Sequence, residues 1–359
     1  MTIRYEIAER VLHFKQPAGT SRGTYTTRRS WFVTLTDDEG RQGAGECAPL
    51  PRLSCDDLPD YQQRLQELCE AFCRYASRAS WPDAMAPWAV IDSDDALLSA
   101  FRPYPSMLFG METAFHQLQA HRSMLFRTPF SRGEEGIPIN GLVWMGTYDE
   151  MLSRIEEKIK AGFRCVKLKI GAIEFDKELD LIWHIRNSFG REQIELRVDA
   201  NGAFSPDSAL QRLEQLARYD IHSIEQPIRQ GQWQEMARLC RESPLPIALD
   251  EELIGVNTTD EKERLLDTIR PAYIILKPSL HGGMAGSHEW IEMARKRGIG
   301  SWITSALESN IGLHAIAHLT AHLYGPQVRM PQGLGTGLLF TDNIPMPIEI
   351  RQDRLWYCC

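Results

Sequence analysis

The sequence of 359 residues predicts an α/β fold: a (β/α)8-type barrel with an N-terminal α+β capping domain. From residue 137 onward, short apolar runs alternate with helical patterns. Acidic residues or lysines close successive runs at 169, 199, 225, 250 and 277, with gaps of 30, 26, 25 and 27 residues. The first third lacks this alternation. A regular series of eight strand–helix units favours a closed barrel over an open sheet.

In the first third, strands precede helices. Alternating apolar residues and β-branched or aromatic content predict strands over 3–14 and 30–36, and a short third strand over 43–47. Helical patterns cover 58–78 and 106–124, and a proline-containing irregular stretch lies between them. We assign residues 1–135 to the capping domain and expect the C-terminal tail, 341–359, to complete it.

The barrel is assigned to residues 136–340. Its predicted strands are 137–144, 165–170, 194–201, 222–227, 245–252, 272–278, 300–307 and 328–335. The intervening helices cover 148–162, 175–190, 205–219, 232–243, 260–267, 283–298 and 310–323. Gly162 is a plausible C-cap, and Ser205 followed by Pro206 is typical of a helix start. No GxGxxG follows the first strand of the series, which argues against a dinucleotide site.

Composition excludes several classes of protein. The net charge of −8 and the pI of about 5.7 argue against nucleic-acid binding. No apolar run approaches the roughly 18 residues of a membrane span. The charged N-terminus lacks the apolar core of a signal peptide, and the eight cysteines form no zinc or disulfide pattern. We therefore expect a cytoplasmic protein with a small-molecule partner, neither nucleic acid nor membrane. The sequence does not specify its oligomeric state.

Three carboxylates end consecutive predicted strands: Asp199 closes LRVD, Glu225 closes HSIE and Asp250 closes IALD. Any one alone could cap the following helix. Neighbouring strands lie about 5 Å apart, so three together would converge and repel one another unless a cation neutralised them. Carboxylates without histidine or cysteine select Mg²⁺, with Mn²⁺ possible, over Zn²⁺.

Three lysines accompany these acids. Lys167 and Lys169 lie two apart on one strand and point to the same face, while Lys277 ends the apolar run IILK. An exposed, solvated pair is the alternative for the first two. Near one another and near a cation, lysines have depressed pKa values, so one can act as a base. We expect Lys169 and Lys277 to face each other across the pocket. The implied chemistry is abstraction of a proton next to a carboxylate, with a metal stabilising the resulting enediolate.

Lys167-Leu168-Lys169, the three acids and Lys277 resemble the motif set of the enolase superfamily, specifically its muconate-lactonising subgroup. The resemblance covers the whole chain, including the capping module. RVDANGAF (197–204), SALES (305–309) and GLGTGLLFTDN (333–343) are most similar to the branch that performs a dehydration in menaquinone biosynthesis. The Asp-x-Asp that dipeptide epimerases carry near the eighth strand is replaced by Gly333, Leu334 and Gly335, which favours a substrate without an ammonium group.

The resemblance implies a hydro-lyase that dehydrates 2-succinyl-6-hydroxy-2,4-cyclohexadiene-1-carboxylate. It implies that Lys169 removes the α-proton, that Lys277 stabilises the intermediate as a cation, and that Lys167 lowers the pKa of Lys169. Mg²⁺ would bind Asp199, Glu225 and Asp250. The candidate substrate-binding residues are Asn140, Ser305, Ser309, Gly333 and Gly335, and those that support the metal ligands are Asn201, Glu251 and Arg197.

Some of these residues have a second interpretation. Ser309 could instead cap a helix, and Arg197 could form a structural ion pair inside the barrel. Segments 19–28 and 48–54 are expected to be loops that cover the pocket, although the second could be an ordinary surface loop. The alternative functions are a racemase of N-acylated amino acids, with Lys169 and Lys277 as bases on two faces, and a catalytically silent barrel. Idle buried charges would destabilise the latter.

Overall fold

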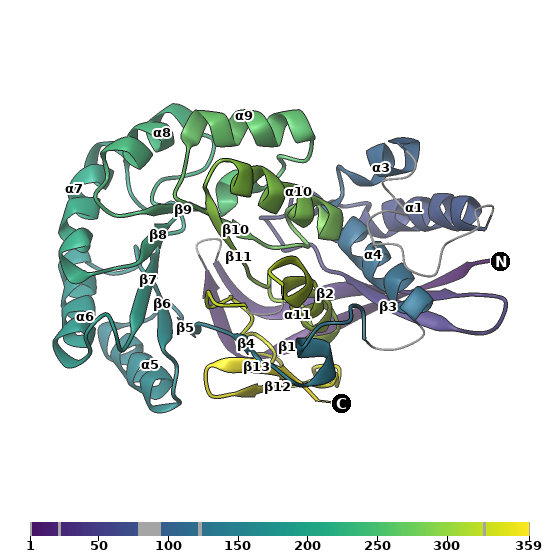
Figure 1. The fold of residues 1–359 in the computed structure, drawn as a ribbon, viewed down its shortest axis with the longest axis horizontal. Helices are drawn as coiled ribbons and strands as arrows, with labels where there is room; N and C mark the ends of the chain where they lie inside the picture. Colours follow the sequence, from purple (N-terminus) through teal and green to yellow (C-terminus); the bar gives the residue numbers. More distant parts are fainter. Residues whose placement is uncertain (1, 21–22, 78–94, 121–123, 326–327, 359) are drawn as a thin grey trace.

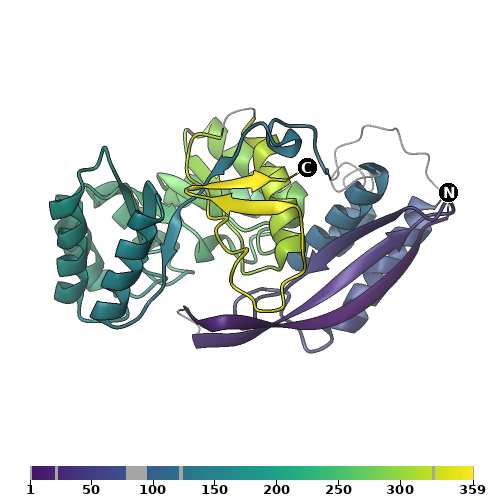
Figure 2. The same cartoon turned by 90° about the horizontal axis from the view of Figure 1, so that it is seen from below.

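The computed structural model describes residues 2–20, 23–77, 95–120, 124–325 and 328–358. Its first part is an antiparallel sheet in the order β1-β2-β3, formed by Arg4–Thr20, Gly23–Thr36 and Gln42–Cys47. Helices α1 (Tyr61–Ala76), α3 (Asp95–Phe101) and α4 (Pro105–Ala120) follow it. Figure 2 shows β1 and β2 as a long hairpin that extends beneath the C-terminal strands.

Two details of the capping domain differ from the sequence prediction. The pairing of β1 with β2 continues from Ala18, opposite Tyr25, to Thr20, opposite Gly23, so much of 19–28 is hairpin strand rather than loop. A shift in register between His13 and Ala18 separates this end from the rest of the hairpin. Helix α3 begins at Asp95, the last residue of the stretch 80–95 that was predicted to be irregular, and the rest of that stretch lies outside the described residues.

The second part is a curled parallel sheet in the order β5 to β11. Its strands are Gly141–Val143, Cys165–Lys169, Glu195–Asp199, Ser223–Glu225, Ile247–Leu249, Tyr273–Leu276 and Gly300–Ile303. Helices α5 to α11 connect and cover them: Tyr148–Lys160, Phe175–Ser188, Pro206–Leu216, Trp233–Glu242, Thr259–Ile269, Gly283–Lys296 and Asn310–Leu323. In Figure 1, α5 to α9 form an outer arc around the strands, as expected of a barrel.

Local sequence explains where several barrel helices start. Thr147 and Thr258 each form a reciprocal capping box with a glutamate three residues later, which satisfies otherwise unpaired backbone N–H groups. Ser205 caps α7 with Pro206 in its first turn, as predicted. Gly162 follows the end of α5 with φ of +89°, a conformation that favours glycine.

The ring of strands closes differently from the prediction. The strand predicted over 137–144 divides into β4 (Ile137–Pro138) and β5, and 328–335 is not a continuous strand. Instead, Gln332 forms a parallel bridge to Ile139, and Gly333 forms one to Thr304. Pro331 has no backbone N–H to donate to a longer ladder, and glycines weaken strands. Two bridging residues therefore occupy the place of the eighth strand.

The C-terminal tail contacts both parts of the molecule. Thr341 N donates to the His13 carbonyl at 2.9 Å, which attaches the tail to β1. Further on, β12 (Ile348–Arg351) and β13 (Arg354–Tyr357) form an antiparallel sheet with β4 at the barrel. The expectation that the whole tail completes the capping domain is therefore wrong for β12 and β13, because their backbone partners belong to the barrel. The division at 135/136 and 340/341 stays a prediction.

Apolar side chains form one large core inside and around the barrel and a second between the capping sheet and its helices. A smaller cluster joins the two parts and includes Tyr25, Leu50, Leu280 and Leu307. Within the described part of the chain, no helix is long and apolar enough to cross a membrane. The small cluster lies beside the ends of the barrel strands that carry the predicted chemistry.

Strand β3 packs against α4 through glycines. A Cβ atom on Gly45 would lie 1.8 Å from the Gly110 carbonyl oxygen, so we expect Gly45→Ala to lower the free energy of unfolding by at least about 2 kcal/mol. Gly190→Ala is the control, because the nearest atom to its Cβ would be 4.0 Å away. Urea unfolding of both variants measures the difference; equal stability would contradict this packing.

Candidate active site

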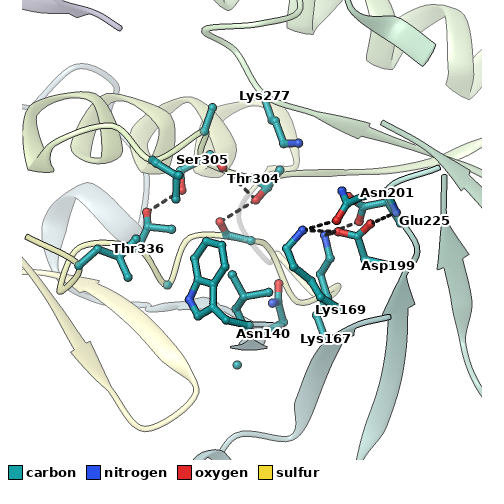
Figure 3. Close-up of a pocket in the computed structure, with 18 of the residues that line it drawn as sticks. Asn140, Lys167, Lys169, Asp199, Asn201, Glu225, Lys277, Thr304, Ser305 and Thr336 are labelled. Carbon is teal, nitrogen blue, oxygen red and sulfur yellow. Dashed lines mark hydrogen bonds and ion pairs between the residues drawn. The ribbon is translucent and has the colours of Figure 1, made fainter. Parts of the chain in front are cut away.

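The predicted acids and lysines meet at the C-terminal ends of the barrel strands. Strand register pairs Lys169 with Asp199 and Asp199 with Glu225, so these side chains share one layer of the sheet. Asp250 directly follows β9 and Lys277 directly follows β10. Figure 3 shows Lys277 entering the pocket from a different side than Lys167 and Lys169, as expected from the strand order.

Ion pairs connect these groups. Lys169 Nζ lies 3.0 Å from Asp199 Oδ2 and donates to Asn201 Oδ1 at 2.6 Å. Lys167 Nζ lies 2.9 Å from the same Asp199 oxygen and also contacts Glu225 Oε2. Lys277 Nζ contacts Asp250 Oδ2. Each acid thus contacts at least one ammonium group. Among the described residues, no group of three or more acidic, histidine or cysteine side chains is already arranged to hold a metal.

The acids nevertheless have unused binding capacity for a cation. Among the described residues, Glu225 Oε1, Asp250 Oδ1 and Glu251 Oε2 are buried without a hydrogen-bond partner. Burial, followed by the charge of Asp199, raises the pKa of Glu225. Burial and then the charge of Asp250 raise the pKa of Glu251 to about 7. Unpartnered buried carboxylate oxygens are costly, and a hard divalent cation with oxygen ligands fits them.

Two of the lysines have raised pKa values in this structure. Burial by itself would lower the pKa of Lys167, but Asp199, Glu225 and Asp250 raise it above the usual lysine value. Lys277 is likewise raised to about 12, because the attraction of Asp250 and Glu251 outweighs burial. The prediction of depressed values refers to lysines beside a bound cation and stays a prediction. The carboxylates responsible are the same ones that would bind a cation.

The pocket beside these groups is apolar on its capping side. Tyr25 from the hairpin and Leu50 and Leu53 from segment 48–54 line it, which confirms that both predicted covering segments reach the site. Trp144 and Leu339 add apolar surface from the barrel domain. An apolar cover of this kind excludes water from a reacting group.

Four of the five predicted substrate-binding residues line the pocket: Asn140, Ser305, Gly333 and Gly335. The Ser305 hydroxyl lies 2.6 Å from the Thr336 hydroxyl, and both residues are buried. Ser309 is the exception. Its hydroxyl caps α11 and donates to Glu46 Oε2 at 2.5 Å, away from the pocket lining. The substrate-binding prediction for Ser309 is wrong, because Ser309 is the N-cap of α11 and its hydroxyl is bonded to Glu46.

The predicted supporting residues divide into two groups. Asn201 lies beside the lysines, and its Nδ2 donates to Glu251 Oε1 at 2.9 Å, so both belong to the site. Asn201 adopts φ of +44°, a strained backbone position that often marks functional sites. Arg197 instead donates to Glu195 and to the Pro331 carbonyl, and it stacks over Trp302 at 4.4 Å. The second interpretation of Arg197, a structural ion pair inside the barrel, is therefore confirmed.

Sequence reasoning missed several lining residues. Thr304 and Thr336 provide hydroxyl groups, and Leu307 provides apolar surface. Thr336 lies inside the segment GLGTG (333–337), which the sequence placed near the site. The sequence did not indicate that its side chain points into the pocket. Glu46 accepts three hydrogen bonds from Ser309 and Gly312 of the barrel and one from Ser30 of its own sheet. It had no signal beyond its place at the end of a predicted strand.

Comparison with known proteins identifies the family. Residues 150–353 match the family described as enolase C-terminal domain-like. The chain belongs to this enolase family. The o-succinylbenzoate synthase of Desulfotalea psychrophila is 50% identical over 94% of this chain and 95% of the relative. The crystal structure of MenC from D. psychrophila covers 99% of this chain and 100% of its own, with 43% identity and a TM-score of 0.82.

More distant enolase-family structures show the same fold. The muconate lactonizing enzyme of Pseudomonas fluorescens has a TM-score of 0.78 at 23% identity, covering 98% of this chain and 93% of its own. A dipeptide epimerase of Enterococcus faecalis, solved with Mg and a dipeptide, has a TM-score of 0.82 at 19% identity, covering 100% and 98%. Enolase-superfamily enzymes use a divalent metal ion, which agrees with the oxygen-rich donor set described above.

The two serine helix caps provide a test of the Ser309 correction. Removing the exposed Ser205 cap of α7 by Ser205→Ala should lower stability by about 1 kcal/mol. Ser309→Ala should cost about 2–3 kcal/mol, because it also leaves a buried Glu46 oxygen with one hydrogen bond fewer. Urea unfolding compares the two variants. An equal or smaller loss at Ser309 would contradict the buried contact.

Proposed function

We propose that this chain is an o-succinylbenzoate synthase, a hydro-lyase that dehydrates 2-succinyl-6-hydroxy-2,4-cyclohexadiene-1-carboxylate to o-succinylbenzoate in menaquinone biosynthesis. The observation that carries the proposal is 50% identity to a synthase of that name over 94% of the chain. The pocket agrees with it. Lysines and acids lie at one end, apolar side chains cover it, and segment 333–335 offers no acid to a substrate ammonium group.

In the proposed mechanism, Lys169 performs both proton transfers. Its Nζ lies at the pocket surface, held by Asp199 and Asn201. As a neutral amine it removes the proton α to the ring carboxylate. The resulting ammonium then protonates the departing hydroxyl group on the same face, so water leaves and the ring becomes aromatic. One side chain that acts first as base and then as acid accounts for a syn elimination.

The neighbouring side chains prepare this transfer. Asp199, Glu225 and Asp250 would hold Mg²⁺, or Mn²⁺ in its place, which supplies positive charge next to the substrate carboxylate as its α-proton leaves. Lys167 contributes a second ammonium group, which contacts the same Asp199 oxygen as Lys169. Lys277 enters from another side and stabilises negative charge that spreads into the ring. Asn201 and Glu251 hold Lys169 and the acids in place.

The remaining lining residues would bind the rest of the substrate. Asn140, Ser305 and Thr336 carry neutral hydrogen-bonding groups, and Gly333 and Gly335 line the pocket without side chains. Tyr25, Leu50 and Leu53 cover the substrate and exclude water. One further activity follows from the same site. Because Lys169 and Lys277 approach from different sides, the site could also racemise an N-acylated amino acid by proton transfer on two faces.

Replacement of the proposed base tests the mechanism. Lys169→Met should lower the rate of o-succinylbenzoate formation by at least about 10³-fold, which is within the range of general-base catalysis. Calorimetry should show that Mg²⁺ still binds, since the three acids remain. The control is Lys177→Met, whose lysine is exposed on α6 and pairs with Glu174. A Lys169→Met rate near that of the control would exclude this lysine as the base.

Metal removal tests the acid cluster. Mg²⁺ at a hundredfold excess over its Kd should raise the free energy of unfolding by about 2.7 kcal/mol relative to EDTA. Catalysis should also stop in EDTA. Asp250→Asn should lose most of the stabilisation by Mg²⁺. The control Asp267→Asn should keep it, because Asp267 is exposed and pairs with Arg297. Urea unfolding with Mg²⁺ or EDTA measures the effect; the same shift in both variants would count against Asp250 as a ligand.

A further inference from the structure

Arg28 is a fully buried cation outside the pocket lining. It lies on β2, is 1% exposed, and forms no ion pair with a described carboxylate. Its guanidinium instead donates to four backbone carbonyls. Nη2 reaches Ala48 at 2.6 Å and Ala306 at 3.4 Å, Nη1 reaches Pro49 at 2.5 Å, and Nε reaches Leu307 at 3.3 Å. One side chain therefore joins two segments that are over 250 residues apart in the sequence.

Both segments form walls of the pocket. Ala48 and Pro49 lead directly into the cover that contributes Leu50 and Leu53. On the barrel side, Ala306 and Leu307 follow Ser305, and all three line the pocket. The bonds of Arg28 thus set the distance between the apolar cover and the wall that carries the Ser305–Thr336 hydroxyl pair.

Each of these walls contains backbone strain. Leu307 has φ of +65° and Arg52, in the cover, has φ of +63°, both in the left-handed region that disfavours side chains. Such residues persist only where surrounding contacts hold them. The bond from Arg28 to the Leu307 carbonyl supplies one such contact. The Tyr25 hydroxyl supplies another in the cover, because it donates to the Pro51 carbonyl at 2.8 Å.

Buried acids complete the support around the guanidinium. Glu308 accepts from Ala306 N at 2.6 Å and from the Ser279 hydroxyl at 2.5 Å. Glu46 accepts from Ser309 N and Gly312 N at the start of α11, both at 3.0 Å. These two acids provide the nearby negative charge that a buried cation requires. The barrel segment is therefore held from both ends, and Arg28 connects it to the cover.

We propose that Arg28 is a positioning residue that fixes the two walls around the succinyl half of the substrate. This inference rests on the proposed function. The acids and lysines bind the ring carboxylate, so the succinyl chain extends toward the opposite end, between the cover and residues 305–307. Arginine suits the task because its planar fork directs several N–H groups at fixed angles. A lysine at this position has one donor atom and cannot bond four carbonyls at once.

Ligand affinities test the proposal without relying on turnover. With Mg²⁺ present, Arg28→Lys should weaken o-succinylbenzoate binding by about tenfold or more, equivalent to ~1.4 kcal/mol. Binding of benzoate, which lacks the succinyl chain, should change by less than about threefold, because its carboxylate meets the unchanged acids and lysines. In kinetics, KM should rise more than kcat falls, and the pH profile of kcat should stay the same. Calorimetry and a dehydration assay measure these values.

Two further variants make the result unambiguous. Arg41→Lys is the matched control, because Arg41 bonds to buried Asp37 in the same part of the chain but lies outside the pocket lining. It should leave both affinities unchanged. Tyr25→Phe removes only the bond to Pro51 and should weaken o-succinylbenzoate, not benzoate, by about threefold, typical of one lost hydrogen bond. If Arg28→Lys does not fold, Tyr25→Phe still tests whether bonds that hold the cover determine the affinity for o-succinylbenzoate.

The outcomes separate the two proposals. A wild-type protein that neither binds nor forms o-succinylbenzoate would refute the proposed function itself. If the wild type is active and Arg28→Lys weakens both ligands equally, or neither, Arg28 has only a structural role and the inference is wrong. Selective loss of o-succinylbenzoate affinity in Arg28→Lys and Tyr25→Phe, with Arg41→Lys unchanged, supports it.

Discussion

The structure depends on balancing buried negative charge at the ends of the barrel strands. Asp199 and Glu225 lie in one layer of the sheet, and Asp250 directly follows the next strand. Without positive charge these buried acids would repel one another strongly. Lysines from β6 and from the end of β10 provide part of that charge, and partnerless carboxylate oxygens remain for a cation. The same arrangement that solves this electrostatic problem places amines next to a site for a substrate carboxylate. Charge balance and proton chemistry therefore have one structural origin.

The capping domain is attached by charges as well as by apolar packing. Glu46 on β3 accepts a hydrogen bond from the backbone N–H of Ser309, at the N-terminus of α11. Glu112 on α4 accepts hydrogen bonds from the backbone N–H groups of Met284 and Ala285 at the start of α10. Negative side chains are favourable at helix N-termini, which carry partial positive charge. These two helices follow the strands that lead to Lys277 and Ser305. Docking of the capping domain therefore orients the part of the barrel that completes the pocket. Arg28 adds hydrogen bonds to the backbone of Ala306 and Leu307.

Much of the barrel was predictable because its information is local. Apolar runs, helix caps and residues at strand ends repeat along the chain, and the described strands β6 to β11 fall where the sequence placed them. Failures occurred where long-range pairing overrode local pattern. Residues 328–335 form two bridges rather than a strand, and β12 and β13 join β4 instead of the capping sheet. The hairpin end near Tyr25 is extended because β1 pairs with it, which no local signal at 19–28 indicated.

The sequence by itself determined the alternation of strands and helices, the order of acids and lysines on them, and the oxygen-only donor set suited to a divalent metal. These follow from residue type and periodicity, which are local properties. Only the tertiary structure decided which polar residues reach the pocket. Ser305 and Thr336 meet there, and Ser309 turns away to cap a helix. Arg197 forms an ion pair with Glu195 instead of reaching the pocket. Side-chain direction at a strand end depends on where the chain turns and on which distant carbonyls and carboxylates surround it.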